Sequence, residues 1–340
     1  MRKKGTGFGL FLLAFLLLTG CTGEENASED SVLYEDEVVD SEDIVVGYSQ
    51  VGSESDWRTA NTESFEQTFT EANGYFLLFE DAQQKQENQL KAIRNFILQE
   101  VDYIILDPIV ETGWDAVLQE AKDAGIPVIL VDRTVKVEDE DLYTCWVGSD
   151  FTREGEQAGE WLKTYLEQQG RSEEEIRIVT LQGTLDSSSQ IGRTQGFQKV
   201  LHTQDNWLML ESQSGDFTQA KGREVMEYFL NTYEDIDVVI GENDNMTFGA
   251  IDAIKAAGKT CGPNGDIIIL SFDAVRAALV SMKNGDINAD FECNPLLGPR
   301  VAEIIEQLEH GETVDKIQYV EETYFDSSMD LKESIKERAY

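Results

Sequence analysis

Planar polar side chains follow the short apolar runs of this sequence, at the points where parallel strands would end. The run Val128–Val131 leads into Asp132 and Arg133, and Val238–Ile240 leads three residues later into Asn243. Carboxylates and amides form two hydrogen bonds in one plane, and a guanidinium donates a fork of them. Ligands of open α/β sheets bind beyond the carboxyl ends of the strands. Because vicinal hydroxyls match this geometry, the pattern predicts a site for a polyol such as a sugar.

The other strand ends add residues of the same kind. The first polar loop contains Glu54, Trp57 and Arg58, and an indole face can cover the C–H face of a sugar ring. Arg193 follows a serine-rich loop at a helix start, and Asp273 follows the last of these apolar runs. The predicted ligand-binding residues are Glu54, Trp57, Arg58, Asp132, Arg133, Arg193, Asn243 and Asp273.

Each of these residues has a structural alternative. Asp132 and Arg133 could form only a local ion pair. Asn243, Asp244 and Asp273 could cap the helices that follow them, which is a common role for both residue types. An amino acid is an alternative ligand, because fixed anion and cation sites would also require charged side chains. Spacing alone leaves these alternatives open.

Catalytic motifs are absent from the sequence. His202 and His310 are the only histidines, which excludes a multi-histidine metal site and argues against imidazole as a general base. The segment Gly258-Lys259-Thr260 resembles the end of a phosphate loop, but Ala253 stands where the first glycine would be. No nucleophile elbow of the G-x-S-x-G type occurs. The sequence therefore predicts a binding protein that is not an enzyme, with no cofactor and no metal.

The charge balance restricts the partners further. The chain has 27 basic and 66 acidic side chains, which give a formal net charge of −39. Nucleic-acid binding needs clustered lysines and arginines that displace counterions, so a nucleic-acid partner is excluded. A cationic surface resting on anionic lipid is excluded on the same ground.

The N-terminus has the features of an export signal. Arg2-Lys3-Lys4 precede the apolar run Phe8–Leu18, which is too short for an ordinary spanning helix. Small residues before Cys21 resemble the lipobox of bacterial lipoproteins, in which that cysteine is acylated after cleavage. We therefore expect a signal peptide over 1–20 and an acidic tether over 21–43. The membrane contact would then be made through the lipid anchor alone.

From residue 44 onward, β-branched runs alternate with stretches of helical periodicity. Such alternation indicates parallel sheets covered by helices on both faces. The body is too long for one core of this kind and suits two lobes. The predicted strands are 44–48, 76–79, 103–106, 128–131, 176–181, 238–240 and 267–270, and the strand-like runs 142–147, 287–291 and 317–324 lie near the expected crossings between lobes.

The predicted fold class is α/β, with two Rossmann-like lobes whose parallel sheets are flanked by helices. A hinge of several crossings joins them, because no linker rich in glycine, serine or proline separates the halves. We expect an N-terminal lobe over 44–147 plus 293–322. The C-terminal lobe would comprise 148–292 plus 323–340.

Several segments together resemble the type I periplasmic sugar-binding proteins of ABC importers, the family of the ribose and galactose binders. The resemblance spans about residues 44–325. It rests on the lipobox, the two-lobed body, Val131-Asp132-Arg133, Asn243-Asp244 and Phe272-Asp273. The segments 51–58, 81–89 and 213–218 resemble the galactofuranose-binding branch.

By this resemblance, the N-terminal lobe would hold the sugar and the C-terminal lobe would close over it. Relatives that bind ribose often carry a glutamine before the hinge proline, whereas this chain has Cys293-Asn294-Pro295. Glu292 or Asn294 could supply that contact instead. The three cysteines of the body, an odd number, predict no disulfide framework and are assigned no chemistry.

The resemblance implies a monomeric, extracytoplasmic lipoprotein that captures a monosaccharide by hinge closure and delivers it to ABC permease subunits. The ligand would be galactofuranose-like, or another hexose or pentose. A sugar sensor for a membrane receptor kinase remains an alternative, and so does a secreted carbohydrate-active enzyme with two opposed carboxylates. A sugar-responsive repressor would need an N-terminal helix-turn-helix, and that place holds the export signal.

Overall fold

A computed structural model of the chain describes residues 43–340. The predicted signal peptide, the acylated Cys21 and all but the last residue of the acidic tether lie outside the described residues. Within 43–340, no helix is both long enough and apolar enough to cross a bilayer.

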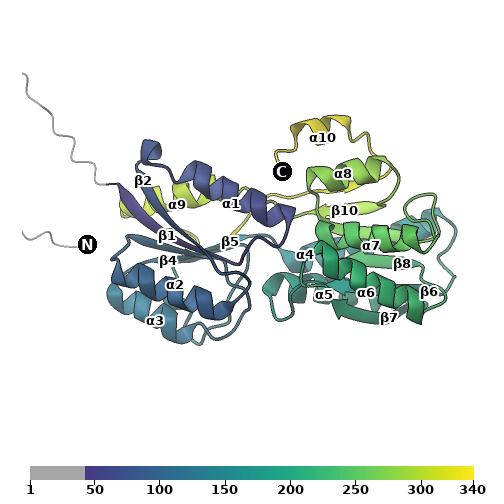
Figure 1. The fold of residues 1–340 in the computed structure, drawn as a ribbon, viewed down its shortest axis with the longest axis horizontal. Coiled ribbons are helices and arrows are strands. Elements are labelled where there is room, and N and C mark those ends of the chain that lie inside the picture. The colour runs from purple at the N-terminus through teal and green to yellow at the C-terminus, as the bar shows by residue number, and fades with distance from the viewer. Residues whose placement is uncertain (1–42) are drawn as a thin grey trace, which may run out of the picture. The chain divides into compact units, whose positions relative to one another are not determined.

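The N-terminal lobe is built on a six-stranded, entirely parallel sheet (Figure 1). Helices α1 and α9 cover one face, and α2 and α3 cover the other. In sheet order the strands are β11 (Ile317–Tyr319), β5 (Cys145–Gly148), β4 (Val128–Val131), β3 (Tyr103–Leu106), β1 (Ile44–Gln50) and β2 (Tyr75–Asp81). The helices are α1 (Asp56–Thr68), α2 (Gln86–Leu98), α3 (Asp115–Ala124) and α9 (Gly298–Glu309), with short 3₁₀ turns at Glu71–Asn73 and Glu140–Leu142.

The C-terminal lobe repeats this plan, with one antiparallel strand at its edge. Helices α4 and α5 pack on one face of the sheet, and α6, α7 and α8 pack on the other. In sheet order the strands are β12 (Tyr324–Asp326, antiparallel), β10 (Ala289–Glu292), β9 (Ile268–Asp273), β8 (Val238–Gly241), β6 (Ile176–Gln182) and β7 (Trp207–Ser214). The helices are α4 (Phe151–Gln168), α5 (Ser188–Leu201), α6 (Gln219–Thr232), α7 (Asp244–Ala256), α8 (Arg276–Lys283) and α10 (Lys332–Glu337).

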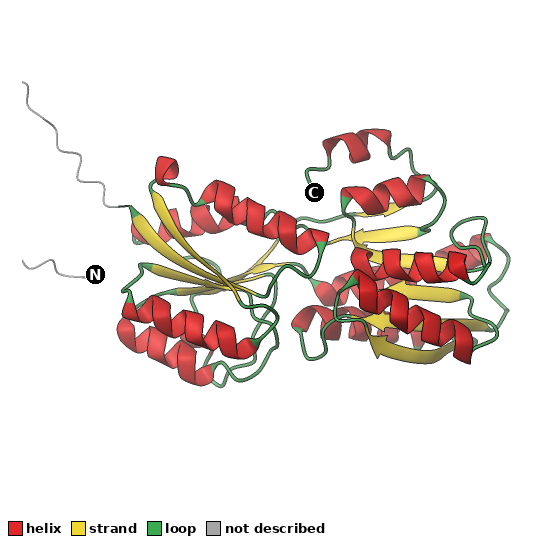
Figure 2. Cartoon of the chain, in the orientation of Figure 1, coloured by secondary structure: helices red, strands yellow, loops and turns green. Residues whose placement is uncertain are grey.

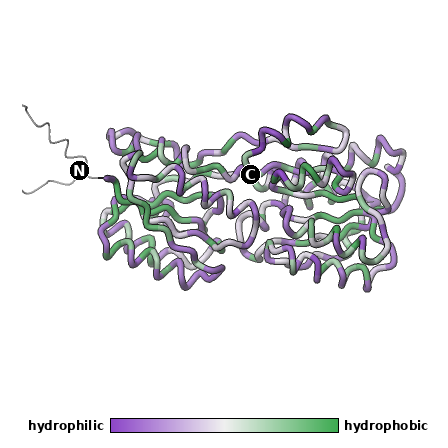
Figure 3. Tube along the Cα trace, turned by 45° about the horizontal axis from the view of Figure 1, so that its top comes forward, coloured by the Kyte–Doolittle hydropathy of each residue, from purple (hydrophilic) through white to green (hydrophobic). Residues whose placement is uncertain are grey.

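The predicted fold class is confirmed: two mostly parallel sheets are each flanked by helices on both faces (Figure 2). The central strands are buried on both sides, as all four residues of β3, β4 and β8 are. Their apolar stretches form the hydrophobic interior of each lobe (Figure 3). Continuous apolar runs were therefore a reliable signal for these strands.

Three details of the predicted elements are wrong. Strand β7 was not predicted, because it is an edge strand whose second half, Glu211–Ser214, is polar. The run 142–147 begins with the end of a 3₁₀ turn, and its strand starts only at Cys145. The run 317–324 is not one strand: it contains β11 and the first residue of β12, which belong to different sheets.

The chain passes between the two sheets three times. The first crossing lies at Ser149–Asp150, between β5 and α4, and the second at 293–297, between β10 and α9. The third crossing, 320–323, joins β11 to β12 and lies within the strand-like run 317–324. The exact lobe limits stay a prediction. Three crossings provide the geometry of a hinge, in which a few residues absorb the motion between two rigid bodies.

Helices α4 and α5 approach each other so closely that their backbones touch. A Cβ atom at Gly155 would collide with the carbonyl oxygen of Arg193 and lie 2.9 Å from the backbone nitrogen of Phe197. A Cβ at Gly196 would collide with the carbonyl oxygen of Thr152. The glycines therefore set the position of α5, and with it the position of Arg193.

We expect Gly155→Ala to lower the free energy of unfolding by about 1–3 kcal/mol, because a backbone atom cannot move aside as a flexible side chain can. Urea denaturation of the ligand-free protein measures this effect. Glu160→Ala, on the exposed face of the same helix, serves as the control and should change stability by less than about 0.5 kcal/mol. Equal stability of the two variants would contradict the close approach of the helices.

Candidate functional site

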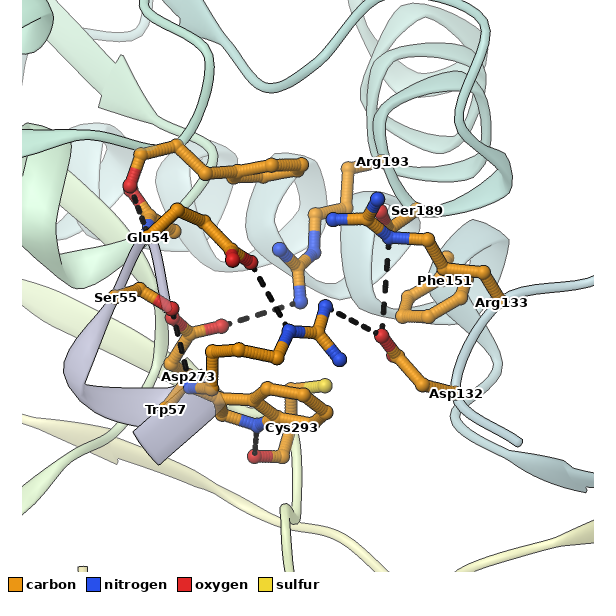
Figure 4. A pocket seen from close by; sticks show the side chains of 13 residues that line it. Glu54, Ser55, Trp57, Asp132, Arg133, Phe151, Ser189, Arg193, Asp273 and Cys293 are labelled. Atoms are coloured by element: carbon orange, nitrogen blue, oxygen red, sulfur yellow. Dashed lines mark hydrogen bonds and ion pairs between the residues drawn. The ribbon is translucent and has the colours of Figure 1, made fainter. Parts of the chain in front are cut away.

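A pocket lies between the two lobes, with an empty volume of about 280 Å³ (Figure 4). All eight residues predicted from the sequence line it. Ser55, Phe151, Ser189, Phe217 and Cys293 complete the lining. The structure thus brings the predicted residues together at the carboxyl ends of strands from two sheets. Whether they bind a ligand stays a prediction.

Arg58 is held at the start of α1 by a network of carboxylates. Ser55 caps the helix, with its hydroxyl oxygen 3.1 Å from the Arg58 backbone nitrogen. The Arg58 guanidinium donates to Glu54 Oε1 at 3.0 Å, to Asp132 Oδ2 at 2.9 Å and to Asp107 Oδ2. Only 2% of the Arg58 surface is exposed. Charge pairs buried to this degree orient the side chains rigidly.

Burial sets the ionisation of this network, and the neighbouring charges modify it. Burial raises the pKa of Asp107 well above its usual range, although Arg58 opposes that shift. For Glu54 the same burial is outweighed by Arg58 and Arg133, so its pKa is lowered. Burial and the charge of Arg58 lower the pKa of Arg133. Glu54 therefore stays ionised in the pocket at neutral pH.

Two polar atoms of pocket residues have no hydrogen-bond partner within the described part of the chain. They are Glu54 Oε2 and Arg133 Nε, one acceptor and one donor, and both are buried. Leaving such atoms unsatisfied costs about 1–3 kcal/mol each. A ligand that carries hydroxyls can satisfy both, because a hydroxyl donates and accepts. The pocket is thus chemically incomplete without a polar occupant.

The Asp132-Arg133 pair lies at the carboxyl end of β4 and reaches across the pocket. Asp132 has a left-handed backbone (φ 57°), and its carbonyl oxygen accepts a hydrogen bond from Trp146 Nε1 at 3.0 Å. Arg133 donates to the carbonyl oxygen of Ile109 at 3.2 Å, and its guanidinium lies 5.2 Å from the ring centre of Phe217 in the other lobe. A local ion pair exists too, with 3.7 Å between Arg133 Nε and Asp132 Oδ2. The pair is therefore part of the pocket as well as a local contact.

Arg193 is the corresponding arginine of the C-terminal lobe. Its guanidinium donates to Glu154 Oε2 at 2.6 Å, to the carbonyl oxygen of Glu242 at 2.5 Å and to Asp273 Oδ1 at 3.4 Å. The rings of Phe151, which lines the pocket, and of Phe272, which does not, flank the guanidinium. Burial raises the pKa of Glu154 to about 6 and that of Asp273 well above its usual range, and Arg193 opposes both shifts.

Asn243 caps the helix that follows it, whereas Asp273 does not. Asn243 does cap α7, since its Oδ1 accepts from the Met246 backbone nitrogen at 2.9 Å, while its Nδ2 donates to the carbonyl oxygen of Phe217 at 3.1 Å. Asp273 caps no helix, because α8 begins one residue after its N-cap Val275. Its backbone instead has a φ of 106°, a strained conformation that turns the chain at the pocket.

The lobes are closed on each other, and Trp57 contacts both. Its indole Nε1 donates to the carbonyl oxygen of Cys293 in the second crossing at 2.7 Å. The backbone nitrogen of Asp56 donates to Asn245 Oδ1 at 3.0 Å, which joins α1 to α7. On the opposite rim, the Thr134 backbone nitrogen donates to the Ser188 hydroxyl at 2.9 Å. Trp57 thus lines the pocket although only 4% of its surface is exposed.

The hinge contact differs from what the sequence predicted. Neither Glu292 nor Asn294 lines the pocket. Glu292 pairs with Arg338 and accepts from the Tyr340 hydroxyl at 2.8 Å, and Asn294 Oδ1 accepts from the Leu296 backbone nitrogen at 2.9 Å. Cys293, to which no chemistry was assigned, lies in the pocket instead.

Sequence reasoning also missed residues whose types carried no signal. Phe151 and Ser189 were not singled out, and Ser55 and Phe217 were noted only within the segments 51–58 and 213–218, without a role in binding. Asp107 was not among the predicted residues, although it pairs with Arg58 behind the pocket. Only its position after β3 could have identified it.

Two α/β lobes joined by three crossings, with a buried polar pocket between them, define a binding protein that encloses its ligand. The comparisons agree, because the periplasmic binding protein domain family matches residues 46–295. The chain belongs to the periplasmic binding protein family.

Relatives of known ligand show considerable identity over most of the chain. The galactofuranose-binding protein YtfQ of Escherichia coli is 42% identical over 286 residues, which cover 83% of this chain and 87% of that protein. A Mycobacterium smegmatis structure in complex with β-D-fucofuranose has a TM-score of 0.83 and 42% identity, covering 87% of this chain and 95% of the other. The binding component of an arabinose ABC transporter from Shewanella sp. ANA-3, bound to α- and β-L-arabinofuranose, has a TM-score of 0.80 and 42% identity, with the same coverage.

Proposed function

We propose that this protein captures a monosaccharide, in a galactofuranose-like form, by closing its two lobes over the ring. The observation that carries this proposal is the convergence of planar polar side chains from both lobes on one buried pocket. The ligand-binding residues would be Glu54, Trp57, Arg58, Asp132, Arg133, Arg193, Asn243 and Asp273. The furanose binding of the relatives supports the choice of ring form.

The charges of the pocket favour a neutral ligand. Three arginines and three carboxylates line it, and both Arg58 and Arg193 are already paired within the protein. A zwitterionic amino acid would need an unpaired cation and an unpaired anion. Sugar hydroxyls instead add to the existing hydrogen bonds, and the pocket rejects analogues that lack them because its own polar groups would be left unpaired.

The same pairing argues against glycoside hydrolysis. A general acid needs a protonated carboxyl beside the scissile bond, and its partner must be free to act as a nucleophile or base. Glu54 and Asp132 both pair with Arg58, and Asp273 pairs with Arg193. The pKa of Glu54 is lowered, so Glu54 is no proton donor, whereas Asp273 with its raised pKa faces no free carboxylate, because Glu54 and Asp132 are both bound to Arg58. The pocket therefore suits binding without chemistry on the ligand.

Delivery and location belong to the same proposal. The closed protein would dock on the permease subunits of an ABC importer and release the sugar there, as a monomer tethered through acylated Cys21. Closure is stabilised only by a ligand that binds the closed form more tightly than the open one. The buried pocket, in which both lobes contribute arginines, supports such a difference.

A calorimetric screen of the purified protein tests this proposal. Galactofuranose, L-arabinose, D-ribose, D-glucose and two amino acids are each titrated, and the mixtures are assayed afterwards for altered sugar. We expect at least one furanose-forming sugar to bind and to be recovered unchanged. We expect neither amino acid to bind. Binding of an amino acid alone, or turnover of a sugar, would overturn the proposal.

A further inference from the structure

One carboxylate joins all three crossings of the hinge. Glu322 lies in the third crossing, and its Oε1 accepts a hydrogen bond from the hydroxyl of Ser149 in the first crossing at 2.5 Å. The same oxygen accepts from the backbone nitrogen of Asn294, in the second crossing, at 2.8 Å. The Ser149 hydroxyl also lies 3.3 Å from the sulfur of Cys293. No other contact of the pocket or hinge described above links the three segments in this way.

The same carboxyl group faces the arginine network of the pocket. Three side-chain atoms lie within 4.8 Å of one another: a carboxylate oxygen of Glu154, the sulfur of Cys293 and a carboxylate oxygen of Glu322. Glu154 Oε2 is occupied by Arg193, whereas its Oε1 is buried and has no hydrogen-bond partner among the described residues. At this separation the two carboxyl groups repel each other when both are charged. Glu154 therefore lies between Glu322 of the hinge and Arg193 of the pocket.

We propose that Glu322 is a positioning residue: it clasps the three crossings in the closed geometry and, through Glu154, holds Arg193 in place for the ligand. This inference rests on the proposed function, because the ligand is the sugar proposed above. Glu322 itself does not line the pocket, so its effect on binding is exerted through the hinge and through Glu154.

The electrostatics of the clasp favour the protonated form of Glu322. Burial, and then the charge of Glu154, raise the pKa of Glu322 to about 8, and the hydrogen bonds from Ser149 and Asn294 oppose that shift together with Arg193. Burial likewise raises the pKa of the neighbouring Cys293 thiol. At neutral pH, Glu322 is therefore largely protonated. A metal ion would suit this cluster less well than a proton, because the positive charge of Arg193 already faces Glu154.

The sign of the resulting pH dependence follows from linkage. If opening of the hinge relieves burial and separates Glu322 from Glu154, the pKa of Glu322 falls toward its usual value in the open form. The closed form then binds the extra proton. The contribution of this proton to the stability of the closed form is therefore greatest at acidic pH. It declines as the pH rises from the pKa of Glu322 in the open form to its pKa in the closed form, and it is gone above about pH 8. Sugar affinity should therefore fall between pH 6 and pH 9, by at most about tenfold per pH unit.

Two substitutions of Glu322 test whether this residue positions the hinge for binding or only stabilises the fold. Glu322→Ala removes all of its hydrogen bonds, whereas Glu322→Gln keeps the Oε1 acceptor and, like the protonated acid, carries no charge beside Glu154. Glu321→Ala, at the exposed neighbouring position, is the matched control. Small-angle X-ray scattering of the ligand-free proteins reports lobe opening, and titration calorimetry with the sugar identified in the screen reports affinity at pH 6 and pH 9.

We expect Glu322→Ala to enlarge the ligand-free radius of gyration and to weaken sugar binding about tenfold or more at pH 6. Glu322→Gln should bind as the wild type does at pH 6 and keep that affinity at pH 9, where the wild type weakens. The clasp would be overturned if Glu322→Ala had the same radius of gyration and the same affinity as the wild type. It would also be overturned if Glu322→Gln lost affinity at pH 9 as the wild type does. If no sugar binds the wild type, the proposed function fails, while the scattering comparison still tests the clasp.

Discussion

Replacing Arg58 with alanine should lower the free energy of unfolding by about 3–5 kcal/mol and abolish sugar binding. The physical reason is that removing one partner of a buried charge network leaves the others uncompensated. Asp107 is fully buried, and Glu54 and Asp132 are also inaccessible in the closed protein. Urea denaturation of the ligand-free protein, followed by calorimetry with the sugar, measures both effects.

The pH dependence of the variant provides an internal test. Without Arg58, burial holds the pKa of Asp107 even further above its usual range. A carboxyl group whose folded-state pKa is raised destabilises the fold as the pH rises through that pKa. The stability difference between variant and wild type should thus be larger at pH 8 than at pH 5. Arg94→Ala, which removes an exposed pair with Glu120, is the control and should cost less than about 1 kcal/mol at both pH values.

Equal losses from Arg58→Ala and Arg94→Ala would contradict the buried network. A loss that grows toward acid would contradict the ionisation described for Asp107. Either result would also remove the main reason for regarding Arg58 as a rigid part of the pocket.

The sequence predicted the fold and the pocket residues through one shared principle. Buried parallel strands read as continuous apolar runs, and the first polar residues after them must meet at one edge of the sheet. Asp132, Asn243 and Asp273 were found in this way. Arg193 belongs to a helix, and its inclusion depended on the serine-rich loop before it rather than on a strand end.

What the sequence could not predict depends on distance in three dimensions. Glu322 and Ser149 are 173 positions apart and meet only because three crossings converge. The orientation of Glu154 toward Arg193 requires the glycine-mediated contact of α4 with α5. Strand β7 and the division of 317–324 between two sheets were missed because short edge strands carry weak apolar patterns.

Trp57 shows how closure and binding are combined in one side chain. It belongs to the N-terminal lobe, yet its buried contacts are with the apolar cluster of the C-terminal lobe, which includes Phe151 and Cys293. The Arg58 guanidinium lies 4.7 Å from its ring centre. The indole therefore packs against the closed partner lobe while it lines the pocket, and both sets of contacts are lost when the lobes separate.

We expect Trp57→Ala to weaken sugar binding by roughly 30- to 1,000-fold, since truncating a central aromatic anchor commonly costs about 2–4 kcal/mol. The melting temperature without sugar should change little, because the sugar-free molecules that are open do not make the contacts that are lost. Trp57→Phe is the matched variant, which keeps an aromatic face but loses the hydrogen bond to the Cys293 carbonyl. Its affinity for sugar should lie between those of the wild type and Trp57→Ala. Thermal melts with and without sugar measure these differences. A ligand-free melt that collapses in Trp57→Ala would make this residue part of the structural core, and the two lobes would then be held closed by packing rather than by the sugar.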